Sequence, residues 1–309
     1  MTPPARIDLS RMHHLYPFRS NFVRHGRLSY HYIDEGAGEP LVMLHGNPTW
    51  SFYYRFLISR LSVRYRTVVP DHIGCGLSDK PDLDGYDYQL HSRIEDLEFL
   101  INHLRLDRKI TLIVHDWGGM IGMAYALRRP EKIARLIIMN TAAFFPPAGK
   151  KLPFRLRLMR NLSPFSDVAV RGLNLFAIAA AFMATHKGLP REIKHGLTAP
   201  YNSWKHRIAV LRFVKDIPVG PSDASYELVQ YIDRHLDRLS HLPMLICWGM
   251  RDFVFDKDYL AEWQRRFPQA NVVAFSDAGH YVLEDVPEKI HRCIEAFLTQ
   301  HPVDGEEVV

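Results

Sequence analysis

Apolar runs of strand length alternate with segments of helical periodicity through the first half of the chain. Short, continuous apolar runs at 41–44, 109–114 and 133–139 are typical of strands buried on both faces of a sheet. Apolar residues recur at helical spacing over 88–104, and a second helix is predicted over 118–129. This alternation predicts a parallel sheet with helices on both faces.

The alternation stops in the middle of the chain and returns later. From Phe144 to Asp216 the sequence shows helical stretches and loops but no convincing buried strand. Strand-like runs return at 244–248 and 271–275, and a helix over 287–298 closes the pattern. We therefore predict an α/β sheet that is interrupted by a helical insertion.

Composition excludes several classes of protein. The 309 residues are 47% hydrophobic and carry a net charge of +5, without the Lys/Arg tract of a nucleic-acid-binding arm. Cys75, Cys247 and Cys293 lie far apart without metal-ligand spacing, and residues 1–6 lack the apolar core of a signal peptide. We expect a cytoplasmic protein with reduced thiols, with no metal, no cofactor and no nucleic-acid partner.

The most informative stretch is 114–119, with the sequence VHDWGG. It joins a predicted strand to a predicted helix through a sharp turn, which is the setting of a nucleophile elbow. Gly118 and Gly119 provide the small residues that such a turn needs. The residue at the apex is Asp116, whose carboxylate can attack an electrophilic carbon directly and form an ester or an anhydride. The alternative is that Asp116 caps the following helix.

Two further polar loops follow predicted strands. Asp252 comes after the 244–248 strand, and His280 comes after the 271–275 strand. Open α/β sheets place their sites at such strand ends, and the order nucleophile, acid, histidine is that of the hydrolase triad. The pattern predicts His280 as a base that is oriented by Asp252, with Asp256 as the alternative orienting residue.

The loop at Asn47 supplies candidate hydrogen-bond donors. The backbone N–H groups of Asn47 and Trp117 would form an oxyanion hole beside Asp116. Their side chains can donate further N–H groups into the same pocket, which suits a leaving anion such as a halide or a carboxylate. Alternatively, Asn47 is a turn residue before Pro48 and Trp117 packs in the core.

These residues resemble the α/β-hydrolases that use an aspartate nucleophile, and the similarity covers nearly the whole chain outside the insertion. The segments HGNPT at 45–49 and VHDWG at 114–118 are similar to haloalkane dehalogenase motifs. The resemblance implies a mostly parallel eight-stranded sheet and a halide-binding role for the Asn and Trp of these motifs. Asn140 stands where some dehalogenases have an orienting Glu, which favours Asp252 as the acid.

Three longer motifs resemble one group within this family, the β-lactone decarboxylases of bacterial long-chain olefin synthesis. They are HGNPTWSFYYR at 45–55, DHIGCGLSDKP at 71–81 and AGHYVLED at 278–285. The resemblance implies decarboxylation of a cis-dialkyl β-lactone to a cis-olefin and carbon dioxide. It also implies a small apolar, long-chain substrate and a complex with other olefin-pathway enzymes. Attack at the carbonyl and attack at the ring carbon are both compatible with the sequence.

Three other functions stay open. A haloalkane dehalogenase would use Asp116 to displace halide and His280 to activate the hydrolytic water. An epoxide hydrolase usually needs two lid tyrosines, and the insertion contains only Tyr201. A non-catalytic relative would bind a ligand or partner, but it has no need of the complete set of candidate residues. That set is Asn47, Asp116, Trp117, Asp252 and His280.

The insertion resembles the cap of this family, which implies core segments at 1–143 and 217–309 and a cap at 144–216. Its larger apolar residues either line a pocket or pack between cap and core: Phe144, Phe145, Leu158, Phe165, Leu175, Phe176, Phe182 and Trp204. It is also basic: Lys150, Lys151, Arg155, Arg157, Arg160, Arg171, Lys187, Arg191, Lys194, Lys205, Arg207, Arg212 and Lys215. These cations either dock the cap on a membrane surface or an acidic partner, or form a solvated surface.

Overall fold

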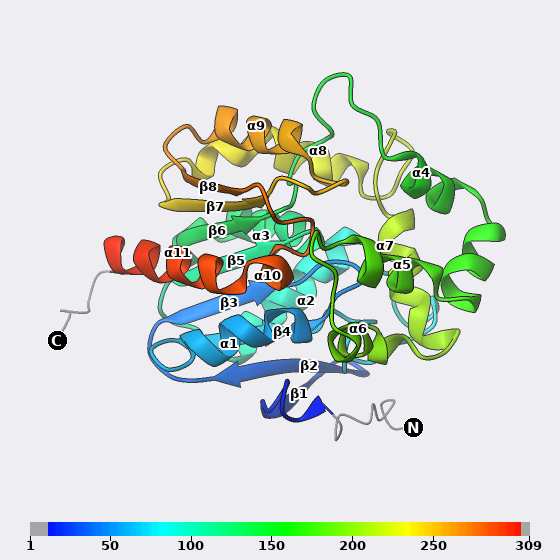
Figure 1. Ribbon diagram of the computed structural model, residues 1–309, viewed down its shortest axis with the longest axis horizontal. Helices are drawn as coiled ribbons and strands as arrows, with labels where there is room; N and C mark the ends of the chain where they lie inside the picture. Colours follow the sequence, from blue (N-terminus) through cyan, green and yellow to red (C-terminus); the bar gives the residue numbers. More distant parts are fainter. Residues whose placement is uncertain (1–11, 304–309) are drawn as a thin grey trace.

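A mostly parallel sheet of eight strands organises the chain, as the sequence predicts (Figure 1). The computed structural model describes residues 12–303. The spatial order of the strands is β1-β2-β4-β3-β5-β6-β7-β8; only the β1–β2 and β2–β4 pairs are antiparallel. The strands are β1 (Ser20–His25), β2 (Leu28–Glu35), β3 (Pro40–Leu44), β4 (Arg66–Pro70), β5 (Ile110–His115), β6 (Ile133–Met139), β7 (Met244–Gly249) and β8 (Asn271–Phe275).

Helices cover both faces of this sheet, because residues alternate between the two faces along each strand. On β5, Leu112 and Val114 join one core cluster, while Ile113 joins the other. The first face packs against α2 (Leu90–His103), α3 (Trp117–Arg128), α8 (Tyr226–His235) and α9 (Lys257–Arg266). The second face packs against α1 (Arg55–Leu61), α10 (Val282–Asp285) and α11 (Pro287–Gln300). Burial on both faces explains the continuous apolar runs of the central strands.

The segment between β6 and β7 is helical and lies beyond the carboxyl ends of the parallel strands (Figure 1). Its helices are α4 (Phe154–Asn161), the π-helix η4 (Asp167–Gly172), α5 (Leu175–Met183), α6 (Arg191–Thr198) and α7 (Ile208–Lys215). Short 3₁₀ turns complete the described chain: η2 (Ser51–Tyr54), η3 (Pro130–Lys132), η5 (Ala199–Tyr201), η6 (Lys205–Arg207) and η7 (Leu236–Leu239). Within residues 12–303, no helix is long and apolar enough to cross a membrane.

The hydrophobic pattern did not predict the edge strand β1. Phe22 of this strand is exposed and Val23 is buried, so β1 lacks the continuous apolar run of the central strands. Its antiparallel pairing with β2 holds it at the edge of the sheet. The expectation about a leader concerned residues 1–6, which lie outside the described residues.

Gly118 gives a test of how closely α3 approaches the sheet. A Cβ at this position would overlap the backbone oxygen of Leu44, and a backbone atom cannot rotate away. Alanine gains about 1 kcal/mol of helix propensity over glycine, but the overlap is the larger effect. We expect Gly118→Ala to lower the free energy of unfolding by about 2 kcal/mol in urea titrations. Gly220→Ala is the control, since no atom lies within 4 Å of its Cβ position; equal stability of the two variants would contradict this packing.

Candidate active site

Asp116 stands at the junction of β5 and α3 in a strained backbone conformation. Its φ is +50° and its ψ is −127°, a region that non-glycine residues rarely adopt. The surroundings enforce this turn: a Cβ at Gly46 would overlap the Asp116 carboxyl group, and the Thr141 hydroxyl donates to the Asp116 backbone oxygen. The side chain does not cap the second or third N–H of α3; the Gly119 N–H donates to the Asp116 backbone oxygen instead. The alternative role of a helix cap is therefore not realised.

The Asp116 carboxylate accepts hydrogen bonds from two backbone amides. The Asn47 N–H donates to Oδ1 at 2.7 Å, and the Trp117 N–H also donates to the carboxyl group. Burial raises the pKa of Asp116, while the charge of His280 and the two amides lower it, and the net shift is upward. The predicted oxyanion-hole amides thus bind the carboxylate of Asp116 itself.

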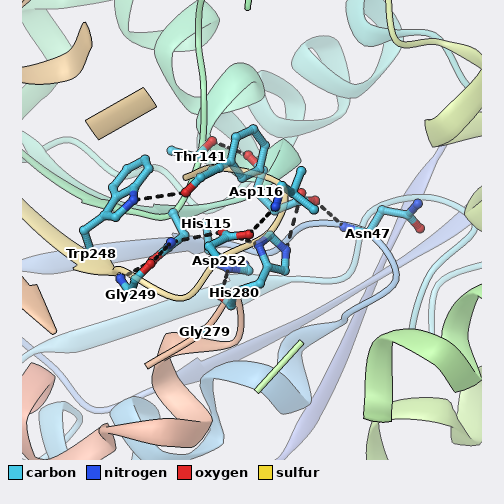
Figure 2. A network of polar contacts seen from close by, with 12 residues as sticks. Asn47, His115, Asp116, Thr141, Trp248, Gly249, Asp252, Gly279 and His280 are labelled. Atoms are coloured by element: carbon cyan, nitrogen blue, oxygen red, sulfur yellow. Dashed lines mark hydrogen bonds and ion pairs between the residues drawn. The ribbon is translucent and has the colours of Figure 1, made fainter. Parts of the chain in front are cut away.

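His280 lies between two carboxylates (Figure 2). Its Nδ1 is 2.8 Å from Oδ2 of Asp252, and its Nε2 is 3.7 Å from Oδ2 of Asp116. Asp256 does not contact His280: it caps α9 by accepting from the Asp258 N–H, and it pairs with Lys150. The structure therefore places Asp252, and not Asp256, beside the imidazole.

Burial and charge act in opposite directions on His280. Burial lowers the pKa of the imidazole, because an imidazolium is poorly solvated there. The charge and hydrogen bond of Asp252, together with the charge of Asp116, raise the pKa, and the net shift is upward. The two carboxylates thus favour the protonated form of the His280 ring.

Three residues that the sequence reading did not assign hold this arrangement. Asn140 donates from Nδ2 to Oδ2 of Asp252 at 3.0 Å. The His115 Nε2–H donates to the backbone oxygen of His280 at 2.8 Å, and the carboxylate of Asp285 accepts from the Gly279 N–H at 2.8 Å. The sequence indicates only that Asn140 replaces a Glu, whereas in the structure its amide donates to the carboxylate of Asp252. His115 and Asp285 carried no signal beyond their place in motifs.

A cavity of about 380 Å³ opens beside Asp116. Its walls are mostly apolar, and their polar side chains come from Asn47, Asp116, Trp117, Tyr259, His280 and Tyr281. Of the apolar residues singled out in the insertion, five line it: Phe144, Phe145, Leu158, Leu175 and Phe176. Phe165, Phe182 and Trp204 neither line the cavity nor pack in the core, since they are 50%, 61% and 48% exposed.

The Asn47 side chain is tied to the helical segment above the site. Its Nδ2 donates to the backbone oxygen of Val210 on α7 at 3.1 Å, which uses one of the two amide hydrogens. Trp117 lines the cavity and stacks at an angle on Phe213, with 5.3 Å between the ring centroids. Thus α7 contacts both Asn47 and Trp117.

In the described part of the chain, no group of three or more His, Cys, Asp or Glu could hold a metal ion.

An eight-stranded, mostly parallel sheet with a strained strand-to-helix turn that carries Asp116, and His280 and Asp252 beside it, defines an α/β-hydrolase. The model of the alpha/beta hydrolase fold family matches residues 39–287, and the chain belongs to this family.

Within the family, the chain is similar to proteins named as decarboxylases and to proteins named as haloalkane dehalogenases. It is 50% identical to a cis-3-alkyl-4-alkyloxetan-2-one decarboxylase of Shewanella oneidensis, over 93% of this chain and 90% of that protein. It is 32% identical to haloalkane dehalogenase 2 of Mycobacterium tuberculosis, over 93% of this chain and 98% of that one. The crystal structure of haloalkane dehalogenase DatA from Agrobacterium tumefaciens superposes with a TM-score of 0.82 at 25% identity, covering 91% and 96% of the two chains.

The contact between Asp252 and His280 predicts how the imidazole titrates. In an Asp252→Asn variant, burial is no longer balanced by the partner's charge, so the His280 pKa should fall below its wild-type value. NMR titration of the imidazole resonances measures this shift. Asp256→Asn is the matched control and should leave the His280 pKa unchanged. A larger shift in the control than in Asp252→Asn would contradict the assignment.

Proposed function

We propose that the chain decarboxylates cis-dialkyl β-lactones to cis-olefins and carbon dioxide, with Asp116 as the nucleophile. The observation that carries this proposal is the single carboxylate, aligned by two amides and by the His280–Asp252 pair, at an apolar cavity. The 50% identity to a protein named as a cis-3-alkyl-4-alkyloxetan-2-one decarboxylase supports the choice of substrate. The apolar walls suit the two alkyl chains of such a lactone.

The two oxygens of Asp116 have different surroundings, and we propose attack at the ring carbon by the oxygen that faces His280. Oδ1 accepts from the Asn47 amide, whereas Oδ2 faces His280 at 3.7 Å. In the proposed first step, Oδ2 bonds to the ring carbon that carries oxygen, and the C–O bond breaks. The bonding electrons leave on the oxygen, which gives a carboxylate and an alkyl ester of Asp116. The amides then hold the ester carbonyl at Oδ1, in the place where they already hold the carboxylate.

The second proposed step releases both products. The bond between the carboxylate and its carbon breaks, its electrons form the C=C bond, and the Asp116 ester oxygen leaves with the electrons of the C–O bond. Attack inverts the ring carbon, so departure of the two groups from opposite sides yields a cis-olefin from a cis-lactone. Carbon, oxygen and charge balance without water. The remaining Asn47 amide hydrogen and the Trp117 indole are the proposed donors to the released carboxylate.

Haloalkane hydrolysis is the second candidate, because the chain is 32% identical to a protein of that name and superposes on a dehalogenase. In that reaction His280, held by Asp252, would activate a water that hydrolyses the ester. An epoxide hydrolase is less consistent with the site: Tyr201 is buried and donates to the backbone oxygen of Thr49 at 3.0 Å, and it does not line the cavity. A non-catalytic role would not explain why the chain holds Asp116 in a backbone conformation that costs free energy.

We also propose that residues 144–216 act as a cap over the core segments 1–143 and 217–309. Fifteen apolar residues of this segment form part of the cavity wall, and α7 contacts Asn47, which is what a cap requires. A cytoplasmic location and a complex with other olefin-pathway enzymes stay predictions.

The proposed reaction is tested with a synthetic cis-dialkyl β-lactone and gas chromatography of the products. We expect wild-type protein to form cis-olefin well above the uncatalysed rate. Asp116→Asn should lower the rate by a factor of about 10³ or more, because the amide is a poor nucleophile. Asp256→Asn is the control with an intact site.

Two results would contradict the proposal. One is the absence of olefin above the uncatalysed rate, together with halide release from brominated alkanes, which would identify a dehalogenase. The other is full activity of Asp116→Asn, which would remove the proposed nucleophile from the reaction.

A further inference from the structure

Helix α5 presents large apolar side chains to solvent. Leu175, Ile178 and Phe182 recur at helical spacing and are 49%, 42% and 61% exposed. The small residues Ala177 and Ala181 face inward instead and are both 2% exposed. A helix on the surface of a globular protein normally shows the opposite arrangement, with its polar side outward. Packing within this chain therefore does not explain the outer face of α5.

The exposed apolar surface extends beyond the helix itself. Leu173, just before α5, is 61% exposed, and we refer to Leu173, Leu175, Ile178 and Phe182 as the α5 patch. Trp204, near the adjoining η4, is half-exposed. The Arg171 guanidinium carbon lies 4.6 Å from the centroid of its ring. Gathered apolar residues of this kind mark interaction sites on soluble domains, and amphipathic Trp side chains favour membrane interfaces.

The charge of the cap is opposite to that of the rest of the chain. Residues 144–216 contain 13 Lys and Arg against three Asp and Glu, while the whole chain carries only +5, so the remainder is net negative. Lys150, Arg160, Lys187 and Lys205 are paired with acids outside this segment. Lys194 borders the patch directly: its ammonium lies 3.8 Å from the Phe182 ring centroid. Such an uneven distribution of charge attracts the cap, rather than the rest of the chain, to an anionic surface.

The α5 patch is the outer side of a wall of the active site. Leu175 belongs both to the patch and to the wall of the cavity that contains Asp116, and Phe176, Ala179 and Ala180 of the same helix line that cavity too. At its C-terminal end, the backbone oxygen of Ala184 accepts from the N–H of Tyr281, the residue after His280, at 2.8 Å. A surface that binds α5 therefore lies one helix away from the cavity and is connected to the catalytic loop.

We propose that the α5 patch docks on the surface of an anionic lipid bilayer. The apolar side chains would enter the boundary between headgroups and acyl chains, while the surrounding cations meet lipid phosphates. If the proposed function holds, docking also delivers the substrate: a long-chain dialkyl β-lactone dissolves in the acyl phase and reaches the cavity past α5 without crossing water. Apolar side chains flanked by cations match a lipid surface better than an acidic protein surface, which would match only the cations.

Co-sedimentation with vesicles tests the docking. We expect wild-type protein to bind phosphatidylcholine vesicles that contain phosphatidylglycerol, to bind pure phosphatidylcholine vesicles less, and to bind less at high salt. Ile178→Glu should lower the partition coefficient about tenfold, because it places a charge in the acyl boundary. The matched control is Val63→Glu, at a position that is 81% exposed in the loop after α1 and far from the cap in sequence; it should bind like wild type.

Three results would overturn the proposal. One is the absence of binding to either vesicle, and another is equal binding by Ile178→Glu and wild type. The third is self-association of the pure wild-type chain that Ile178→Glu abolishes, without vesicle binding, which would make the patch an interface between copies of this chain.

An activity measurement separates docking from the proposed function. Ile178 does not line the cavity, so Ile178→Glu should convert a short-chain, water-soluble cis-β-lactone at the wild-type rate. With a long-chain lactone carried in vesicles, the same variant should lose most of its olefin formation. Equal rates on the vesicle-borne lactone would contradict delivery through α5. Vesicle binding without olefin from either lactone would support docking and reject the proposed reaction.

Discussion

The pair of backbone hydrogen bonds to Asp116 is the interaction on which the site depends. A carboxylate buried at an apolar cavity would tend to take up a proton, because burial disfavours its charge. The amides of Asn47 and Trp117 and the nearby His280 work against that tendency. They also fix which oxygen faces the cavity. The strained turn at Asp116 is what brings a side chain from β5 within reach of the Asn47 loop, so the backbone strain is part of the same construction.

The other residues of the site hold the His280 ring beside Asp116 and raise its pKa. Asp252 holds one ring nitrogen, and Asn140 in turn orients Asp252. The backbone oxygen of His280 is held by His115 from β5, the strand that also leads to Asp116. One strand therefore positions both partners of the Asp116–His280 contact. In this arrangement His280 can activate a water that hydrolyses an ester, or it can stabilise negative charge in a reaction that consumes no water. Which of the two occurs depends on the substrate.

Much of the core could be predicted from the sequence, because the central strands are buried on both faces and their apolar runs are unbroken. The strand at 133–139 was predicted with the bounds that the structure shows. The edge strand β1 was missed, because its mixed burial leaves no such run. Asp116, Asp252 and His280 could be found because each follows a strand end. The supporting roles of Asn140 and Asp285 could not be read from sequence, since they depend on contacts between loops that lie far apart in the chain. The outward apolar face of α5 was also hidden, because the sequence does not show which side of an all-apolar helix faces the core.

The central claim is that Oδ2 of Asp116 forms a transient covalent bond to its substrate. Rapid acid quenching during turnover of a cis-β-lactone, followed by mass spectrometry of the protein and its peptides, tests this most directly. We expect an adduct with the mass of one lactone on the peptide that contains Asp116, and we expect this adduct to disappear as olefin forms. An adduct on another residue of the wild-type protein would contradict this claim. So would an Asp116→Asn variant that turns over the lactone at the wild-type rate.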